Sequence, residues 1–283
     1  MLDLEDLKQI SAKGISVEQV NHQLDEIKNG FPFLRLDSAA AVGKGILVPD
    51  PEEVETYSHA WEDYKRKGHQ IVKFVPASGA ASRMFKNLFA FLNADYDIPV
   101  TDFEKVFFAG LSDFAFFDSL NAQCKKNEGK DISQLIKDGK YKAIVSNLLE
   151  KKGLNYGQMP KGLLLFHKYA DGPRTPMEEH LVEGALYAAG KTGEVNVHFT
   201  VSTEHRALFE KLVAAKAAEY EAKYGTTYHI SFSEQKPSTD TVAADMENKP
   251  FRDKDGKLLF RPGGHGALIE NLNDLDADIV FIK

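Results

Sequence analysis

One segment of the chain sets the expected architecture, and it reads Lys73-Phe74-Val75-Pro76-Ala77-Ser78-Gly79-Ala80-Ala81-Ser82-Arg83-Met84-Phe85-Lys86. The apolar residues from Ile71 to Val75 predict a buried strand. Small residues follow from Ala77 to Ala81, and apolar residues then recur at helical spacing from Met84 onward. A strand, a loop of small residues and a helix start together resemble a phosphate-binding loop, because backbone N–H groups can approach an anion there.

Two side chains at the end of this loop suit the same interpretation. Ser82 is a candidate N-cap of the following helix, and Arg83 offers a guanidinium that can bind phosphate oxygens. An ordinary tight turn between a strand and a helix, in which small side chains serve packing, explains the loop equally well. A loop with a single glycine is a weak motif, so the residues alone leave both interpretations open.

Composition narrows the class of protein. The 283 residues are 43% hydrophobic and 27% charged, which is typical of a globular protein with one large or two ordinary domains. The net charge of −7 argues against a dedicated nucleic-acid binder. The single cysteine, Cys124, excludes an internal disulfide and a cysteine-based zinc site, and its neighbours Lys125 and Lys126 predict a surface thiol. No signal-peptide pattern or membrane-length apolar run is seen, so we expect a cytoplasmic protein without a membrane partner.

Periodicity along the chain predicts an α/β fold. Residues 1–69 predict a helical segment that packs on a core, and residues 70–283 predict the core domain, with a helical insertion at about 87–158. Apolar runs predict further strands, and helices are expected to open at Thr175, as a capping box, and near Glu204. The expected strands are residues 163–166, 195–201, 228–232 and 278–282. This alternation favours a three-layer core with a mainly parallel sheet and helices on both faces, where ligands bind beyond the carboxyl ends of the strands.

A second candidate site lies near the carboxyl end of the chain. Gln235 follows an expected strand, and Pro262-Gly263-Gly264-His265-Gly266 enters an expected helix. The glycines allow the backbone to approach a flat ligand. His265 is a candidate catalytic base, although a packed or solvated histidine in a glycine-rich turn explains it as well.

Several of these motifs occur in the order seen in one enzyme superfamily. The segments Ser78–Met84, Pro160-Lys161 before an apolar run, and Pro262–Gly266, with Gln235 upstream, resemble the sugar-nucleotide pyrophosphorylases. The closest resemblance is to their uridylyltransferase branch, which implies a Rossmann-like fold of the glycosyltransferase-A type. Whole stretches around Phe74–Met84 and Arg261–Leu272 also resemble a bacterial family of uncharacterised proteins.

The resemblance implies nucleotidyl transfer, in which a sugar 1-phosphate attacks the α-phosphate of a nucleoside triphosphate and releases pyrophosphate. It implies that Arg83 neutralises the leaving pyrophosphate and Lys161 the transferring phosphate, and these are the expected catalytic residues. The partners implied are a nucleoside triphosphate and a sugar phosphate, with no nucleic acid. The residues implied in nucleotide binding are Ser78, Gly79, Ala80, Ala81, Ser82, Gln235, Gly263, Gly264 and His265.

The chain also departs from the superfamily pattern. The expected insertion separates Lys161 from the first loop, and the superfamily's metal-binding aspartate follows the strand that here is residues 278–282. Mg²⁺ is therefore expected for a longer protein, and no ligands for it are identified in this sequence. We expect this chain to be an N-terminal portion of such a protein or a degenerate relative. In either case we expect it to bind nucleotide weakly without turnover. A non-catalytic nucleotide- or sugar-binding module is the alternative, and a helical interaction protein is a third.

Overall fold

The computed structural model describes residues 2–79 and 81–283, which form two compact units. The first unit contains the residues up to Ile71 together with Ser233–Ile279, and the second contains Val72–Phe232 with Val280–Lys283. This grouping differs from the expected single domain of residues 70–283, because 233–279 joins the N-terminal segment. Among the helices of the described residues, none has both the length and the apolar content needed to cross a bilayer.

The helices of the first unit begin at side-chain caps. The side chains of Asp3, Ser16 and Asp50 accept hydrogen bonds from backbone N–H groups of the first turns, which satisfies donors that a helix start leaves open. These caps precede α1 (Leu4–Ala12), α2 (Val17–Asn29) and α3 (Pro51–Arg66), and the short helix α11 (Ile269–Leu272) follows the 3-10 turn η6 (His265–Leu268).

A small core joins distant parts of the sequence within the first unit. Ile10, Ile15 and Val20 from the N-terminal helices pack with Val242 and Leu258. The antiparallel pair β8 (Thr241–Val242) and β9 (Phe260–Arg261) supplies this partner surface, and a separate short pair is formed by β1 (Ala41–Val42) and β2 (Gly45–Ile46). Burial of these apolar side chains explains why 233–279 groups with the start of the chain.

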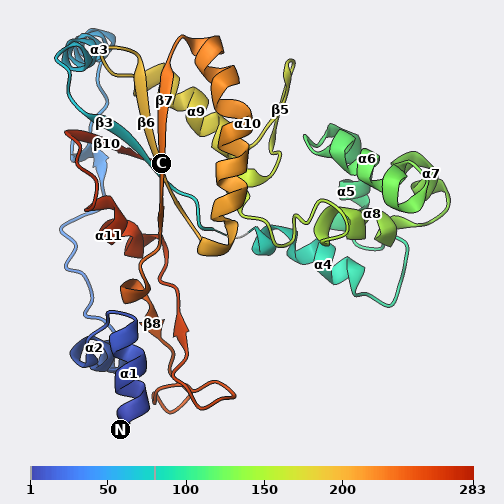
Figure 1. Cartoon of the computed structure of the whole chain (residues 1–283), viewed down its shortest axis with the longest axis horizontal. Helices are drawn as coiled ribbons and strands as arrows, with labels where there is room; N and C mark the ends of the chain where they lie inside the picture. Colours follow the sequence, from blue (N-terminus) through green and yellow to red (C-terminus); the bar gives the residue numbers. More distant parts are fainter. Residues whose placement is uncertain (1, 80) are drawn as a thin grey trace. The chain divides into compact units, whose positions relative to one another are not determined.

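A four-stranded parallel sheet forms the centre of the second unit (Figure 1). Its strands lie in the order β10 (Ile279–Ile282), β3 (Ile71–Pro76), β6 (Glu194–Val201) and β7 (Thr227–Glu234). In the register of β3 with β6, Val72 lies beside Asn196 and Pro76 beside Thr200. Residues 71–75 of β3 are all buried, as expected for a central strand of a parallel sheet.

Two helices cover one face of this sheet, α9 (Pro176–Tyr187) and α10 (Arg206–Tyr224). Their buried side chains share one apolar cluster with the strands, which includes Val75, Met177, Leu181, Val197, Phe199 and Phe209. A mixed α/β fold with a parallel sheet is therefore confirmed. The η4 turn (Thr203–His205) leads from β6 into α10.

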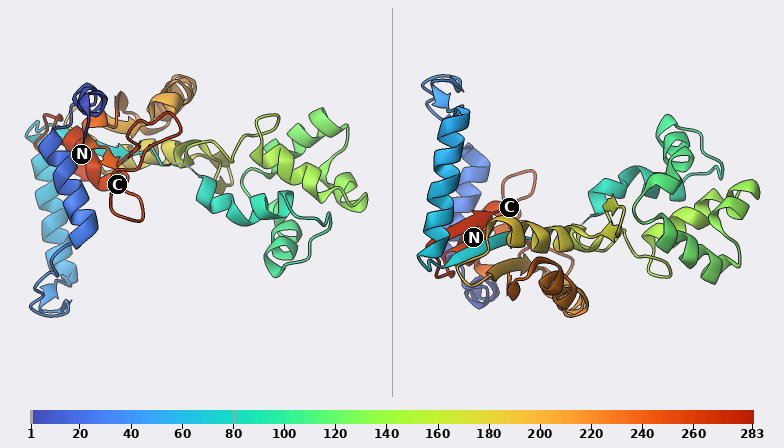
Figure 2. Two further views of the ribbon diagram at one scale, coloured as in Figure 1. Left: turned by 90° about the horizontal axis from the view of Figure 1, so that it is seen from below. Right: turned by 90° about the horizontal axis from the view of Figure 1, so that it is seen from above.

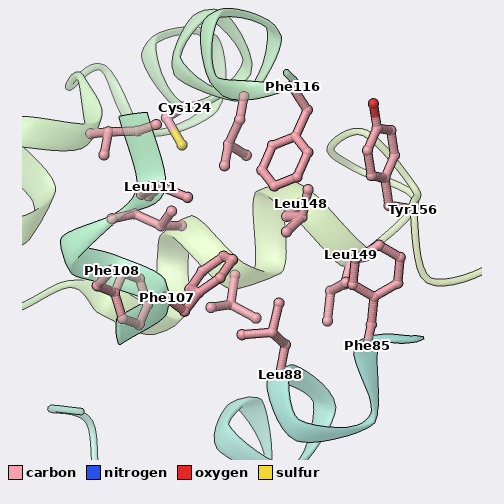
Figure 3. Close-up of a cluster of buried hydrophobic side chains, with 14 of the residues drawn as sticks. Phe85, Leu88, Phe107, Phe108, Leu111, Phe116, Cys124, Leu148, Leu149 and Tyr156 are labelled. Carbon is pink, nitrogen blue, oxygen red and sulfur yellow. The ribbon is translucent and has the colours of Figure 1, made fainter. Parts of the chain in front are cut away.

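Short helices between the first two sheet strands form a cluster of their own, drawn in green in Figure 2. Phe85, Leu88, Phe107, Phe116 and Leu148 point toward one another in its core (Figure 3). The elements are η1 (Ser82–Phe85), α4 (Lys86–Leu92), α5 (Asp102–Ala109), η2 (Leu111–Asp113), α6 (Phe117–Glu128), α7 (Ile132–Lys137) and α8 (Tyr141–Leu149).

Two local expectations are wrong in this region. Cys124 is not a surface thiol but is fully buried in the helical core, and its burial raises the pKa of the thiol to about 11. Residues 163–166 do not form a strand; η3 (Lys161–Leu163) ends there and the hairpin of β4 (His167–Tyr169) and β5 (Gly172–Arg174) follows. Leu163 packs in the sheet cluster and Leu164 in the helical cluster, so the apolar run supplies two cores.

Candidate functional site

The loop of small residues after β3 is held by backbone hydrogen bonds from two other segments. Ala77 N–H donates to the Thr200 carbonyl oxygen at 2.7 Å, and Ala81 N–H donates to the Met159 carbonyl oxygen at 3.2 Å. Lys161 N–H donates to the Gly79 carbonyl oxygen at 3.1 Å. The fold thus brings the predicted phosphate loop and Lys161 together. Ala80, which was predicted with this loop, lies outside the described residues.

A pocket of about 140 Å³ opens beside this loop. It lies at the carboxyl-terminal part of β3, and the first turn of α9 forms one of its walls. The lining residues are Val75, Pro76, Ala77, Gly79, Lys161, Gly162, Pro176, Met177, His180, Phe199 and Phe209. The dipole of α9 adds positive potential there, although Pro176 has no N–H group and the Glu178 N–H is bonded to Thr175 Oγ1 at 3.3 Å.

Lys161 reaches this pocket because η3 lies close to α10. A Cβ atom on Gly162 would lie 2.9 Å from the ring of Phe209, so only glycine allows this approach of the backbone. Gly79 itself borders open space, since a Cβ atom there would meet nothing within 4 Å. Among the predicted residues, Gly79 and Lys161 are therefore the two that line the pocket.

The remaining predicted residues of this loop lie outside the pocket lining. Ser82 is exposed and does not cap a helix, because it is the first residue of η1, whose N-cap is Ala81. Arg83 is exposed, and its guanidinium has no hydrogen bond or ion pair within the described part of the chain. Ser78 is half-buried and Ala81 fully buried.

His180 is a pocket residue that the sequence interpretation missed. It lies on α9, and its ring packs edge-on against Phe199, with 6.2 Å between ring centroids. Burial, aided by the positive charge of Lys73, lowers the pKa of His180 to about 4. Its Nδ1 atom is buried and lies 3.6 Å from Oε2 of Glu183, too far for a hydrogen bond.

Behind His180 lies an ionic cluster that joins β3, α9 and Lys283. Lys73 is fully buried, and its Nζ donates to the Glu183 carboxylate and to the Tyr187 hydroxyl, the latter at 2.7 Å. Lys283 Nζ lies 3.3 Å from the other carboxylate oxygen of Glu183. Burial alone would raise the pKa of Glu183, but hydrogen bonding and charge from the two lysines lower it to about 2.

The second group of predicted residues belongs to the first unit. Gln235 Nε2 donates to the Gly263 carbonyl oxygen at 3.1 Å, which ties the glycine loop to the end of β7. A Cβ atom on Gly263 would lie 2.9 Å from the carbonyl oxygen of Thr239, so this position requires glycine. Gly264 borders open space, and His265 is exposed.

With this geometry in place, the chain can be compared with known proteins. The profile of a family described as a domain of unknown function (DUF4301) matches residues 3–283. The chain belongs to this family. No match was found among curated proteins or among solved structures.

The sequence of this DUF4301 chain does contain a pattern that points to the residues missed above. Lys73 is the one charged residue in an otherwise apolar strand run, which predicts that it needs a buried partner. His180 and Glu183 are three residues apart on an expected helix and therefore share a face. Nothing in the sequence indicated that this face would meet Lys73.

The depressed pKa of His180 predicts a dependence of stability on pH. Because its folded pKa of about 4 lies below its ordinary value of 6.5, the unfolded chain binds more protons between these values. The stabilising contribution is present above pH 6.5 and is lost as pH falls to about 4, at up to about 3 kcal/mol. Urea unfolding should show a smaller loss over this window for His180→Phe than for the wild type, and equal pH profiles would contradict the assignment.

Proposed function

We propose that this chain binds a nucleoside triphosphate and a sugar phosphate at the β3 pocket and serves nucleotidyl transfer. The observation that carries the proposal is the pocket itself, which a glycine of the small-residue loop, Lys161 and the first turn of α9 line together. A cation and a helix start are among the groups that bind phosphate in proteins.

The position of the pocket in the sheet supports the same proposal. Counted along the chain, β3 is the first strand of the sheet; β6 lies on one side of it and the last strand, β10, on the other. In open α/β sheets, ligands bind beyond the carboxyl ends of the strands. The pocket lies at the carboxyl end of β3, and Phe199 of the neighbouring strand β6 also lines it. We therefore propose the finer assignment of a Rossmann-like fold of the glycosyltransferase-A type.

The proposed chemistry needs positioning and charge neutralisation more than a nucleophile on the protein. A phosphate oxygen of the sugar 1-phosphate bonds to the α-phosphorus of the triphosphate. The bond from that phosphorus to the bridging oxygen breaks, and pyrophosphate leaves with the electron pair. Lys161 neutralises the transferring phosphate, and the exposed Arg83 neutralises the pyrophosphate.

Other roles stay predictions from the resemblance. Base recognition is predicted for Gln235, Gly263, Gly264 and His265. The hydrogen bond between Gln235 and Gly263 shapes their loop but does not itself support a role in base recognition. Magnesium in proteins is usually held by one or two carboxylates and by substrate phosphates. The pocket lining includes no carboxylate, and the described residues include no group of three or more metal-ligating side chains. These residues do not fit a magnesium site, so the roles above rest on the chain's own groups.

An assay of pyrophosphate release tests the proposal. The chain is mixed with magnesium, each nucleoside triphosphate and a panel of sugar 1-phosphates, and pyrophosphate is measured against a protein-free blank. The proposal expects pyrophosphate only when both substrates are present, a result that would overturn the expectation from the sequence that the chain binds nucleotide without turnover. Saturable binding of triphosphate without turnover would favour the non-catalytic binding module, and no binding of either substrate would contradict both functions.

A further inference from the structure

His180 is the polar group of the pocket that the proposed chemistry leaves unused. Its side chain is about one-fifth exposed (19%), and it lines the pocket together with Gly79 and Lys161. Phe199 packs against its ring, so the imidazole is held in place rather than free in solvent. A fixed polar side chain in an otherwise apolar wall determines which ligand groups the pocket accepts.

The surroundings of His180 determine which ring nitrogen carries the proton. Nδ1 faces the Glu183 carboxylate at 3.6 Å, and Glu183 stays ionised because Lys73 and Lys283 both contact it. Although this distance is too long for a hydrogen bond, the negative charge of the carboxylate repels a lone pair on Nδ1 and favours the tautomer with the proton there. The ring is neutral near pH 7, since its pKa is lowered to about 4. Nε2 is then left with a lone pair and acts as a hydrogen-bond acceptor.

Nε2 of His180 and the ammonium of Lys161 bind different chemical groups of one ligand. The ammonium of Lys161 has donors only and attracts phosphate oxygens, whereas an ionised phosphate oxygen has no proton to donate to Nε2. A hydroxyl group can donate to Nε2. A ligand that carries a phosphate and a nearby hydroxyl therefore satisfies both groups, and a phosphate ester without hydroxyls leaves Nε2 unpaired.

We propose that Nε2 of His180 accepts a hydrogen bond from a hydroxyl of the sugar that carries the bound phosphate, so that the pocket selects hydroxylated sugar phosphates. This inference deepens the proposed function and rests on its placement of phosphate beside Lys161. It makes His180 a specificity-determining residue of the same pocket.

A matched pair of probes tests this selection by isothermal titration calorimetry. Glucose 1-phosphate and cyclohexyl phosphate share the phosphate and a six-membered ring, but the second has no hydroxyls. The wild-type chain should bind glucose 1-phosphate about tenfold more tightly, and His180→Phe should reduce that ratio severalfold, the effect of one hydrogen bond. Cyclohexyl phosphate should bind to His180→Phe at least as well as to the wild type, which also shows that the variant is folded.

Two further variants separate this role from general damage. His180→Gln keeps an acceptor oxygen and should recover part of the preference for glucose 1-phosphate. Lys161→Ala should weaken both probes and leave their ratio unchanged. An unchanged ratio in His180→Phe, an equal affinity of the wild type for both probes, or no binding of glucose 1-phosphate would overturn the inference. A retained ratio without any pyrophosphate release would instead contradict nucleotidyl transfer alone.

Discussion

Replacing Lys161 by alanine should lower the rate of pyrophosphate release by about two to three orders of magnitude. A preorganised group that stabilises developing charge contributes about 2.7–4 kcal/mol to the transition state, by analogy with oxyanion donors. Lys161 is the lysine that lines the pocket, and its own backbone N–H is bonded to Gly79. The backbone of Lys161 is therefore held beside the loop that we assign to phosphate binding, and its side chain is exposed.

The same substitution has a readout that does not depend on turnover. A hydrogen bond to a charged group contributes about 1.5–3 kcal/mol, so Lys161→Ala should weaken binding of a nucleoside triphosphate by about tenfold to a hundredfold. Lys151→Ala is a matched control. Lys151 is an exposed lysine of the helical insertion, so this substitution removes the same charge at a position away from the pocket lining. Equal affinities and rates for the two variants would remove Lys161 from the site.

Glu183→Leu should destabilise the chain by about 3–5 kcal/mol, the cost of leaving a buried charge without its partner. Lys73 has no exposed surface, and its Nζ depends on Glu183 for the only carboxylate among its described contacts. The free energy of unfolding in urea at pH 7 measures the loss. The Tyr187 hydroxyl remains as a neutral acceptor, but it does not compensate the charge.

The double variant Lys73→Met/Glu183→Leu is the control for this prediction. Removing both charges leaves an apolar pair of similar volume, so it should recover most of the stability that Glu183→Leu loses. If the double variant were as unstable as the single one, packing rather than the ion pair would explain the loss. Burial lowers the pKa of Lys73, so the defect of Glu183→Leu should also shrink as pH is raised toward 10.5.

Local signals in the sequence determined much of the fold. The apolar run before Pro76 became the buried strand β3, and the capping box at Thr175 became the start of α9. There Glu178 N–H donates to Thr175 Oγ1 at 3.3 Å, and Thr175 N–H donates to the Glu178 carboxylate at 2.8 Å. Strand patterning and capping act between residues a few positions apart, so sequence alone can show them.

Tertiary structure alone decided the features that depend on distant partners. Cys124 was assigned to the surface by its charged neighbours, yet neighbouring helices bury it. Residues 163–166 look like a strand because they are apolar, but Leu163 and Leu164 pack in two different cores. Ser82 has the chemistry of a cap, but the turn there begins one residue earlier.

The residues of the candidate site likewise include some that the sequence predicts and some that only the tertiary structure shows. Gly79 and Lys161 could be predicted because a small-residue loop after a strand and a lysine after proline are visible as motifs. The neutral imidazole of His180 could not, because its low pKa comes first from burial and then from the charge of Lys73, 107 positions earlier, with a smaller effect of Lys283, 103 positions later. Burial and charge act through space, and the distances that control them exist only once the strands and α9 have packed together.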